Sequence, residues 1–175
     1  MSINDVFLRT ITASDTSNIV KWRNLPSVRT GFETQGELTA EKHEQWLKEK
    51  VFTGKVSQFI IVDTTTQRDI GSTFLKNVDR INRKAEFGIF IGEDCARGKG
   101  FGSKAASAIL QHGFNDLKLN RIYLRVFSDN IAGIRAYEKA GFSKEGLLSQ
   151  DIIVNGTTKD IVVMAILKQE WVQRG

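Results

Sequence analysis

The sequence contains little cysteine, histidine and proline, and each shortage excludes a class of structure or site. Cys95 is the single cysteine, so an internal disulfide and a zinc cluster built on paired cysteines are excluded. The two histidines, His43 and His112, lie far apart in the chain, which argues against a histidine-based metal site. Pro26 is the single proline, and no stretch rich in serine, glycine or proline marks a linker. We therefore expect one domain over residues 1–175 and no bound metal.

Long apolar segments are also missing. The sequence has no run of roughly 18 apolar residues, the length that a membrane-spanning helix needs. Its start, MSINDVFLRT, lacks the basic-then-apolar layout of a secretion signal. A cytoplasmic protein with no membrane partner is the expectation.

The composition that is present is that of an ordinary globular protein. Of 175 residues, 41% are hydrophobic and 26% are charged, which argues against disordered and fibrous classes. The net charge of +5 fits an anionic ligand or a weak attraction to nucleic acid. The same charge argues mildly against a polycationic substrate. Nucleic-acid binding is the weakest of the functions considered, so no nucleic-acid partner is expected.

Hydrophobic periodicity predicts alternating strands and helices. Strands are expected at 6–12, 58–63, 70–78, 84–92, 121–127, 147–154 and 159–167. Helices are expected at 14–24, 39–51 and 130–140, and in a segment whose apolar stripe runs from Ala106 to Leu117. Gly141 suits a left-handed helix end, and Asn155-Gly156 is a strong hairpin turn. This order predicts an α/β or α+β domain with one mixed sheet.

One loop carries the clearest chemical signal: Arg97-Gly98-Lys99-Gly100-Phe101-Gly102-Ser103-Lys104. It lies between a strand and the expected long helix. Its three glycines free the backbone N–H groups to surround an anion, and the helix adds the positive end of its dipole. The loop matches neither a Walker motif nor the GxGxxG dinucleotide fingerprint. It predicts a phosphate or pyrophosphate site, with a tight surface turn as the alternative.

A second motif follows at a defined distance: Asn130, Tyr137 and Gly141-Phe142. With these two motifs, the chain resembles the GNAT acetyltransferases over nearly its whole length. That family carries Arg/Gln-x-x-Gly-x-Gly/Ala at the start of its central helix and an Asn…Tyr…Gly-Phe pattern farther on. The resemblance implies a GNAT-type domain with a mixed, mostly antiparallel sheet of about seven strands and four flanking helices.

The resemblance also implies a cofactor and a site. Acetyl-CoA is the implied acetyl donor, with its pyrophosphate on the loop from Arg97 to Ser103. The pantetheine arm is implied to pair with the strand at Ile89, Phe90 and Ile91. Asn130 is implied to contact the cofactor and Tyr137 to protonate the leaving thiolate.

Amine acetylation needs further groups. A backbone N–H near Phe90 or Ile91 is expected to stabilise the oxyanion. An alkylammonium has a pKa near 10, so a base or a water chain must remove its proton. Glu86 is the candidate base, because alternation places it on the same strand face as Phe90. The alternative is a surface carboxylate that pairs with Arg83 or Lys84.

The first third of the chain is expected to bind the acceptor. The candidate residues are Trp22, Arg23, Glu33, His43 and Trp46. Trp22-Arg23-Asn24 followed by His-x-x-Trp resembles bacterial enzymes that acetylate nucleotide-linked amino sugars. For each tryptophan the alternative is packing of a helix on the sheet.

The leading hypothesis is therefore an N-acetyltransferase for a primary amine of a small molecule, with a nucleotide-linked amino sugar as the best guess. A polyamine is one alternative, because the segments at 83–87 and 154–156 are similar to those of spermidine enzymes. Phe74 and Asn77 stand where those enzymes place carboxylates, which weakens it, and four nearby acids keep it open: Glu33, Glu37, Glu41 and Glu44. A protein N-terminus, as in the enzymes that modify ribosomal proteins, is another. A non-catalytic acyl-CoA-binding module is the hypothesis from a different class. Pairing of exposed sheet edges into a homodimer is left open.

Overall fold

The computed structural model describes residues 2–3 and 5–173. The N-terminal half begins with two strands and three helices, followed by three long strands. In order they are β1 (Ser2–Ile3), β2 (Val6–Thr10), α1 (Thr16–Asn24), α2 (Pro26–Arg29), α3 (Ala40–Trp46), β3 (Ser57–Asp63), β4 (Arg68–Asp79) and β5 (Lys84–Ile91). A 3-10 turn at Ala13–Asp15 precedes α1, and a π turn at Leu47–Val51 extends α3.

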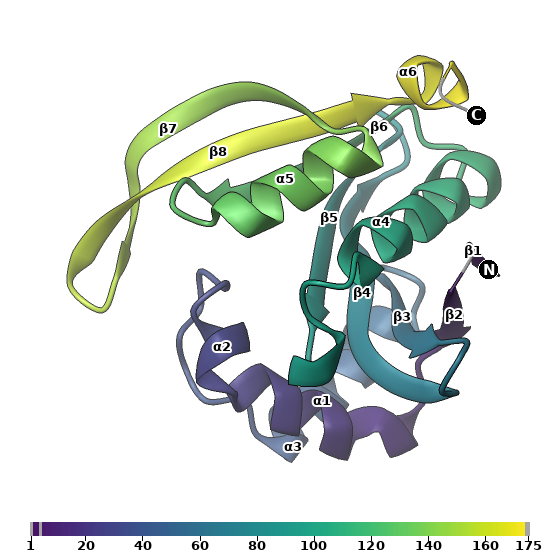
Figure 1. Ribbon diagram of the computed structural model, residues 1–175, viewed down its shortest axis with the longest axis vertical. Coiled ribbons are helices and arrows are strands. Elements are labelled where there is room, and N and C mark those ends of the chain that lie inside the picture. The colour runs from purple at the N-terminus through teal and green to yellow at the C-terminus, as the bar shows by residue number, and fades with distance from the viewer. Residues whose placement is uncertain (1, 4, 174–175) are drawn as a thin grey trace.

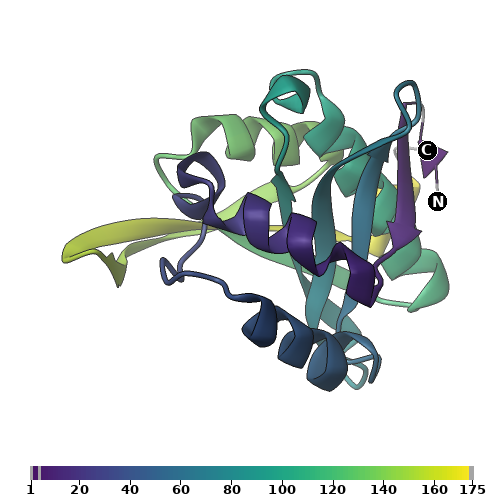
Figure 2. The same cartoon turned by 90° about the horizontal axis from the view of Figure 1, so that it is seen from below.

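The C-terminal half alternates helix and strand before it ends in a long hairpin. Its elements are α4 (Phe101–Gln111), β6 (Arg121–Phe127), α5 (Ile131–Ala140), β7 (Ser143–Val154), β8 (Thr157–Leu167) and α6 (Lys168–Val172). A 3-10 turn at Asp94–Ala96 precedes the glycine loop, and a π turn at His112–Asp116 extends α4. Figures 1 and 2 both show the turn end of the β7–β8 hairpin projecting beyond the rest of the molecule.

These strands form one mixed sheet in the order β1-β2-β3-β4-β5-β6-β8-β7. Its single parallel pair among the described strands is β5–β6, and the other neighbours are antiparallel. The parallel pairing covers only Lys84–Arg121, Ala85–Ile122 and Glu86–Tyr123. Both strands run on beyond these pairs, so the sheet opens between them. The backbone of β5 is exposed along that opening.

Two hydrophobic clusters hold the helices to the sheet. Residues of α4 and α5, among them Ile109 and Ile134, pack with Phe87 in the larger cluster. Residues of α1 and the π turn, among them Ile19 and Leu47, pack with Phe90 in the smaller one. Because adjacent strand positions point to opposite faces, Phe87 and Phe90 place the two helix groups on opposite faces of β5. In Figure 1, α1, α2 and α3 lie together at one end of the strands, away from α6.

The predicted fold class is confirmed, with three short elements that the sequence did not reveal. They are β1, α2 and α6, of two, four and five residues. Such short segments carry too few residues to show a periodicity. The predicted hairpin turn is present, since Asn155 and Gly156 both have positive φ.

Within the described residues, no helix is long and apolar enough to cross a bilayer.

Candidate active site

The glycine loop lines a cavity of about 490 Å³, which we call the loop cavity. Gly98 and Gly100 have φ of +73° and +81°, a backbone region that L side chains rarely adopt. A Cβ added at either glycine, or at Gly102, would meet nothing within 4 Å, so this side of the loop is open. Phe101 and Ser103 belong to the first turn of α4, whose N–H groups have no acceptor within the helix. The loop can therefore surround a phosphate.

The exposed edge of β5 forms another wall of the loop cavity, through Ile89, Phe90 and Ile91. The Arg97 guanidinium ties the loop to this strand: its Nε and Nη2 donate to the carbonyl of Ile91 at 3.2 and 3.1 Å. A strand edge beside an anion-binding loop and a cavity of this size fit an elongated cofactor that carries a pyrophosphate. The predicted cofactor residues come together here, with one exception. The Lys99 side chain lines a different cavity with Asp63 and Trp22, because the loop turns it away.

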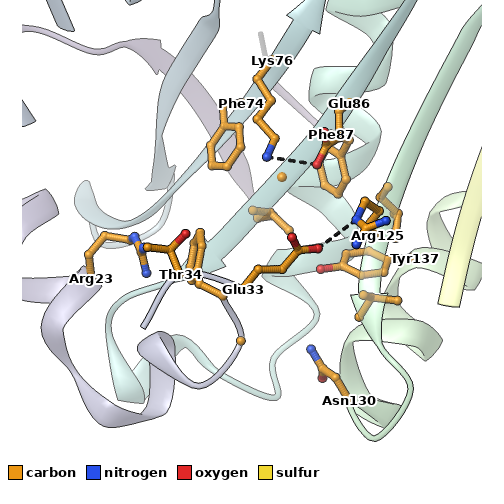
Figure 3. Close-up of a pocket in the computed structure, with 16 residues that line it drawn as sticks. Arg23, Glu33, Thr34, Phe74, Lys76, Glu86, Phe87, Arg125, Asn130 and Tyr137 are labelled. Atoms are coloured by element: carbon orange, nitrogen blue, oxygen red, sulfur yellow. Dashed lines mark hydrogen bonds and ion pairs between the residues drawn. The ribbon is translucent and has the colours of Figure 1, made fainter. Parts of the chain in front are cut away.

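A cavity of about 190 Å³, the central cavity, lies where β5 and β6 separate (Figure 3). It adjoins the loop cavity, because five residues line both: Gly31, Phe32, Ile89, Asn130 and Tyr137. Asn130 caps α5, and its Oδ1 accepts a hydrogen bond from the N–H of Gly133 at 3.0 Å. A ligand that fills the loop cavity therefore meets the central cavity at α5.

Tyr137 is held between two aromatic rings. Its ring lies 5.7 Å from that of Phe87 and 6.2 Å from that of Phe142. Burial raises the pKa of the Tyr137 phenol to about 12. The phenol therefore stays protonated throughout the physiological range, and Figure 3 shows it directed into the central cavity. It is placed to donate a proton there.

Glu86 also lines the central cavity, as predicted from strand alternation. Its cationic partner differs from the two predicted, because Lys76 on β4 lies directly across the sheet. Lys76 Nζ lies 3.0 Å from Oε1, and Asn77 Nδ2 donates to Oε2 at 2.9 Å. The carboxylate is thus fixed in place and 14% exposed.

Glu33 lies in the central cavity too, but it is bound to a residue that the sequence did not single out. Arg125 of β6 donates from Nε to Glu33 Oε1 at 2.8 Å and from Nη2 to Asp151 Oδ2 at 2.5 Å. These bonds tie the loop after α2 to β6 and to the hairpin. One sequence signal could have identified Arg125: the alternating residues Arg121, Tyr123 and Arg125 mark a polar face of the strand.

Arg23, His43 and Trp46 come together in a third cavity of about 370 Å³, here named the α3 cavity. It shares Arg23, Phe32, Thr34, Phe74 and Lys76 with the central cavity. Phe74 lines both cavities, and its ring packs over Gly88, where an added Cβ would lie 2.3 Å from it.

The structure does not bring Trp22 to this group. Its side chain is 1% exposed and packs edge-to-face on Phe90 at 6.4 Å, and its indole N–H donates to Glu93 at 2.7 Å. The alternative, packing of α1 on the sheet, is therefore the role that the structure gives it.

Comparisons with known proteins agree with this geometry. A family model described as an acetyltransferase (GNAT) domain matches residues 5–143. An uncharacterized N-acetyltransferase, p20, of Bacillus licheniformis is 32% identical over 73% of this chain and 71% of its own length. A spermidine N(1)-acetyltransferase of Vibrio cholerae is 33% identical over 65% of each chain, so the match spans just under two thirds of that relative. The crystal structure of spermidine N-acetyltransferase from Vibrio cholerae with CoA and spermine superposes with a TM-score of 0.90, at 26% identity, over 97% of this chain and 99% of that one.

Proposed function

The chain belongs to the GNAT family and is an acetyl-CoA-dependent N-acetyltransferase, and from this premise we propose that its acceptor is a primary amine of a small molecule. The observation that carries the proposal is the junction of the two cavities at Tyr137. One cavity fits the cofactor, and the other leaves a small space beside the phenol for an amine. The resemblance found in the sequence is confirmed by the family match.

The chain's own residues supply positioning and proton transfer. Bound acetyl-CoA supplies the thioester acyl group. The N–H groups of the glycine loop hold the pyrophosphate, and the edge of β5 aligns the rest of the molecule. With acetyl-CoA bound, the Tyr137 hydroxyl would supply the proton that the leaving thiolate needs, because this phenol remains neutral. Glu86 takes the proton of the attacking amine.

Two acceptor classes follow from different observations. The named relatives favour a polyamine over the nucleotide-linked amino sugar expected from the sequence. The charges of the cavities favour an amine that carries an anion. Glu33 and Glu86 are each paired with a cation, Arg125 also bonds Asp151, and Arg23 has no carboxylate partner among the described residues. A polyamine would need free carboxylates to offset its charge.

A thiol-release assay with acetyl-CoA tests the proposal across three groups of acceptors: polyamines, amino sugars with and without a linked nucleotide, and N-terminal peptides. We expect turnover with at least one small amine and none with the peptides. Turnover of peptides alone would contradict the proposal, because it would assign the acceptor to proteins.

We also propose that copies of this chain associate with one another. The relative from Vibrio cholerae is described as dodecameric in one structure. In this chain, β7 forms the edge of the sheet and exposes large apolar side chains, which favours pairing with another copy. A cytoplasmic location stays a prediction.

A further inference from the structure

The α3 cavity has an unbalanced charge. The side chains of Arg23, Lys42 and Lys76 line it, and no carboxylate from the described residues does. Trp46, Phe32 and other aromatic side chains complete its wall. The charge of Lys76 is offset by Glu86 at 3.0 Å, so Arg23 and Lys42 give the cavity its positive charge, which attracts an anion and repels a polyamine.

Two residues that line this cavity each have a buried polar atom with no hydrogen-bond partner within the part of the chain described: Arg23 Nη1 and His43 Nε2. Arg23 stacks on the ring of Phe32, with its guanidinium carbon 3.3 Å from the ring centre. An unpaired buried guanidinium is costly, and burial lowers the pKa of Arg23 to about 10, with a smaller contribution from Arg29. The Phe32 ring thus holds the Arg23 guanidinium in place, while its Nη1 has no hydrogen-bond acceptor among the described residues.

His43 supports the same interpretation. Its Nδ1 lies 3.0 Å from Thr16 Oγ1, and burial lowers the pKa of the imidazole, so the ring is neutral at pH 7. A neutral ring that accepts the Thr16 hydroxyl proton at Nδ1 carries its own proton at Nε2. In this tautomer the unpaired Nε2 is a donor, as Arg23 Nη1 is, whereas a ring protonated at Nδ1 would make Nε2 an acceptor.

We propose that the α3 cavity binds an anionic group, a carboxylate or a phosphate, of the same acceptor molecule whose amine enters the central cavity. Arg23 donates to this group, and so does His43 when its ring is protonated at Nε2. The two cavities share Arg23, so a single ligand can reach both. This inference rests on the proposed function and narrows the acceptor to amines that carry an anion.

The experiment compares acceptors that differ only in the anion. One pair is a hexosamine and its phosphate ester, and the other is pentylamine and 5-aminopentanoate, so the two pairs distinguish phosphate from carboxylate. Spermidine is the cationic comparison. We expect the anionic member of at least one pair to have a kcat/KM about 10-fold higher or more, through a lower KM.

Variants of Arg23 assign the effect to the cavity. Arg23→Gln is expected to lower the ratio of kcat/KM between the acceptor that carries the anion and the one that lacks it by about 10- to 100-fold, while the Kd for CoA is unchanged. Arg23→Lys is expected to restore part of this ratio. Lys21→Gln, which removes an exposed charge from the same helix, is the matched control and should change nothing. Arg23→Met should leave the Tm unchanged or raise it, whereas a purely structural arginine would lower it.

The possible failures are distinguishable. A wild-type enzyme that acetylates no small amine overturns the proposed function. An enzyme that acetylates small amines without preferring the anionic members, or that prefers spermidine, overturns this inference alone. An anion preference that survives in Arg23→Gln also overturns it, because the anion then binds elsewhere.

Discussion

At the scale of single residues, the account depends most on the Tyr137 phenol. Tyr137→Phe removes the proton donor and keeps the ring contacts with Phe87 and Phe142. We expect kcat to fall about 100-fold, the size typical of a lost general acid, with an unchanged Kd for CoA. Steady-state kinetics and calorimetry measure the two quantities. Tyr123→Phe, at the other tyrosine, is the control. Equal activity in Tyr137→Phe would remove the phenol from the mechanism.

The protonation state of Tyr137 also predicts how kcat depends on pH. A pKa raised to about 12 keeps the phenol neutral below that value, so Tyr137 does not cause a loss of kcat between pH 7 and 10. A fall in kcat with a midpoint near pH 8 that disappears in Tyr137→Phe would contradict this placement.

Glu86 gives a second test at this scale. Glu86→Gln is expected to lower kcat/KM about 100-fold at pH 7, where an amine with a pKa near 10 is protonated. The difference from wild type should shrink as the pH approaches 10, because the amine then loses its proton unaided. The control is Glu138→Gln, which removes an exposed carboxylate paired with Lys144. A loss of activity that is independent of pH would mean that Glu86 only positions Lys76 and Asn77.

At the scale of elements, the glycine loop must keep its left-handed backbone. Gly100 caps α4 at φ +81°, where an added Cβ meets open space but strains the backbone by about 1 kcal/mol. Gly100→Ala is therefore expected to weaken CoA binding several-fold by shifting the N–H groups. Calorimetric titration measures the change. Gly36→Ala, at an open position without positive φ, is the control. Unchanged binding in Gly100→Ala would place the pyrophosphate elsewhere.

A partly buried ion network joins the start of α1 to the sheet. Arg9 of β2 bonds both Asp15, at the start of α1, and Asp69 of β4, each at 2.6 Å. Burial acts to raise the pKa of Asp15, but hydrogen bonds from Arg9 and Thr12 outweigh it and lower the pKa. The ionised Asp15 therefore stabilises the fold fully at pH values above the ordinary pKa of an aspartate. This contribution is lost as the pH falls through the lowered pKa of Asp15 in the folded protein.

Asp15→Asn should accordingly lower the free energy of unfolding by about 2 kcal/mol at pH 7, and by less as the pH falls below about 4. Urea denaturation at several pH values measures this difference. Asp116→Asn, at an exposed carboxylate, is the control. An effect of Asp15→Asn that grows toward low pH would contradict the lowered pKa.

The elements were largely predictable from sequence because their signals are local. Alternation placed Phe87 and Phe90 on opposite faces of β5, and Gly141 ends α5 with φ 109°. The central features of the site depend on contacts between distant segments. The bond of Arg125 to Glu33 spans 92 positions, and no local pattern specifies it. Burial of Trp22 and the direction of Lys99 likewise follow from tertiary packing.

At the scale of the whole molecule, the projecting hairpin predicts self-association. Leu147 and Ile153 of β7 are 55% and 72% exposed, which is unusual for large apolar side chains beside an unpaired strand edge. We expect light scattering after gel filtration to show an oligomer, and Leu147→Asp with Ile153→Asp to shift it toward monomer without lowering the Tm. The control is Lys144→Asp, a charge change on the same strand. A monomeric wild-type protein would contradict the expectation.

The most direct test of the account is a crystal structure of the protein with CoA. We expect the pyrophosphate on the N–H groups of residues 98–103 and the thiol within about 3.5 Å of the Tyr137 hydroxyl oxygen, at hydrogen-bond reach. A pyrophosphate bound outside the glycine loop, or a thiol directed away from the central cavity, would contradict it.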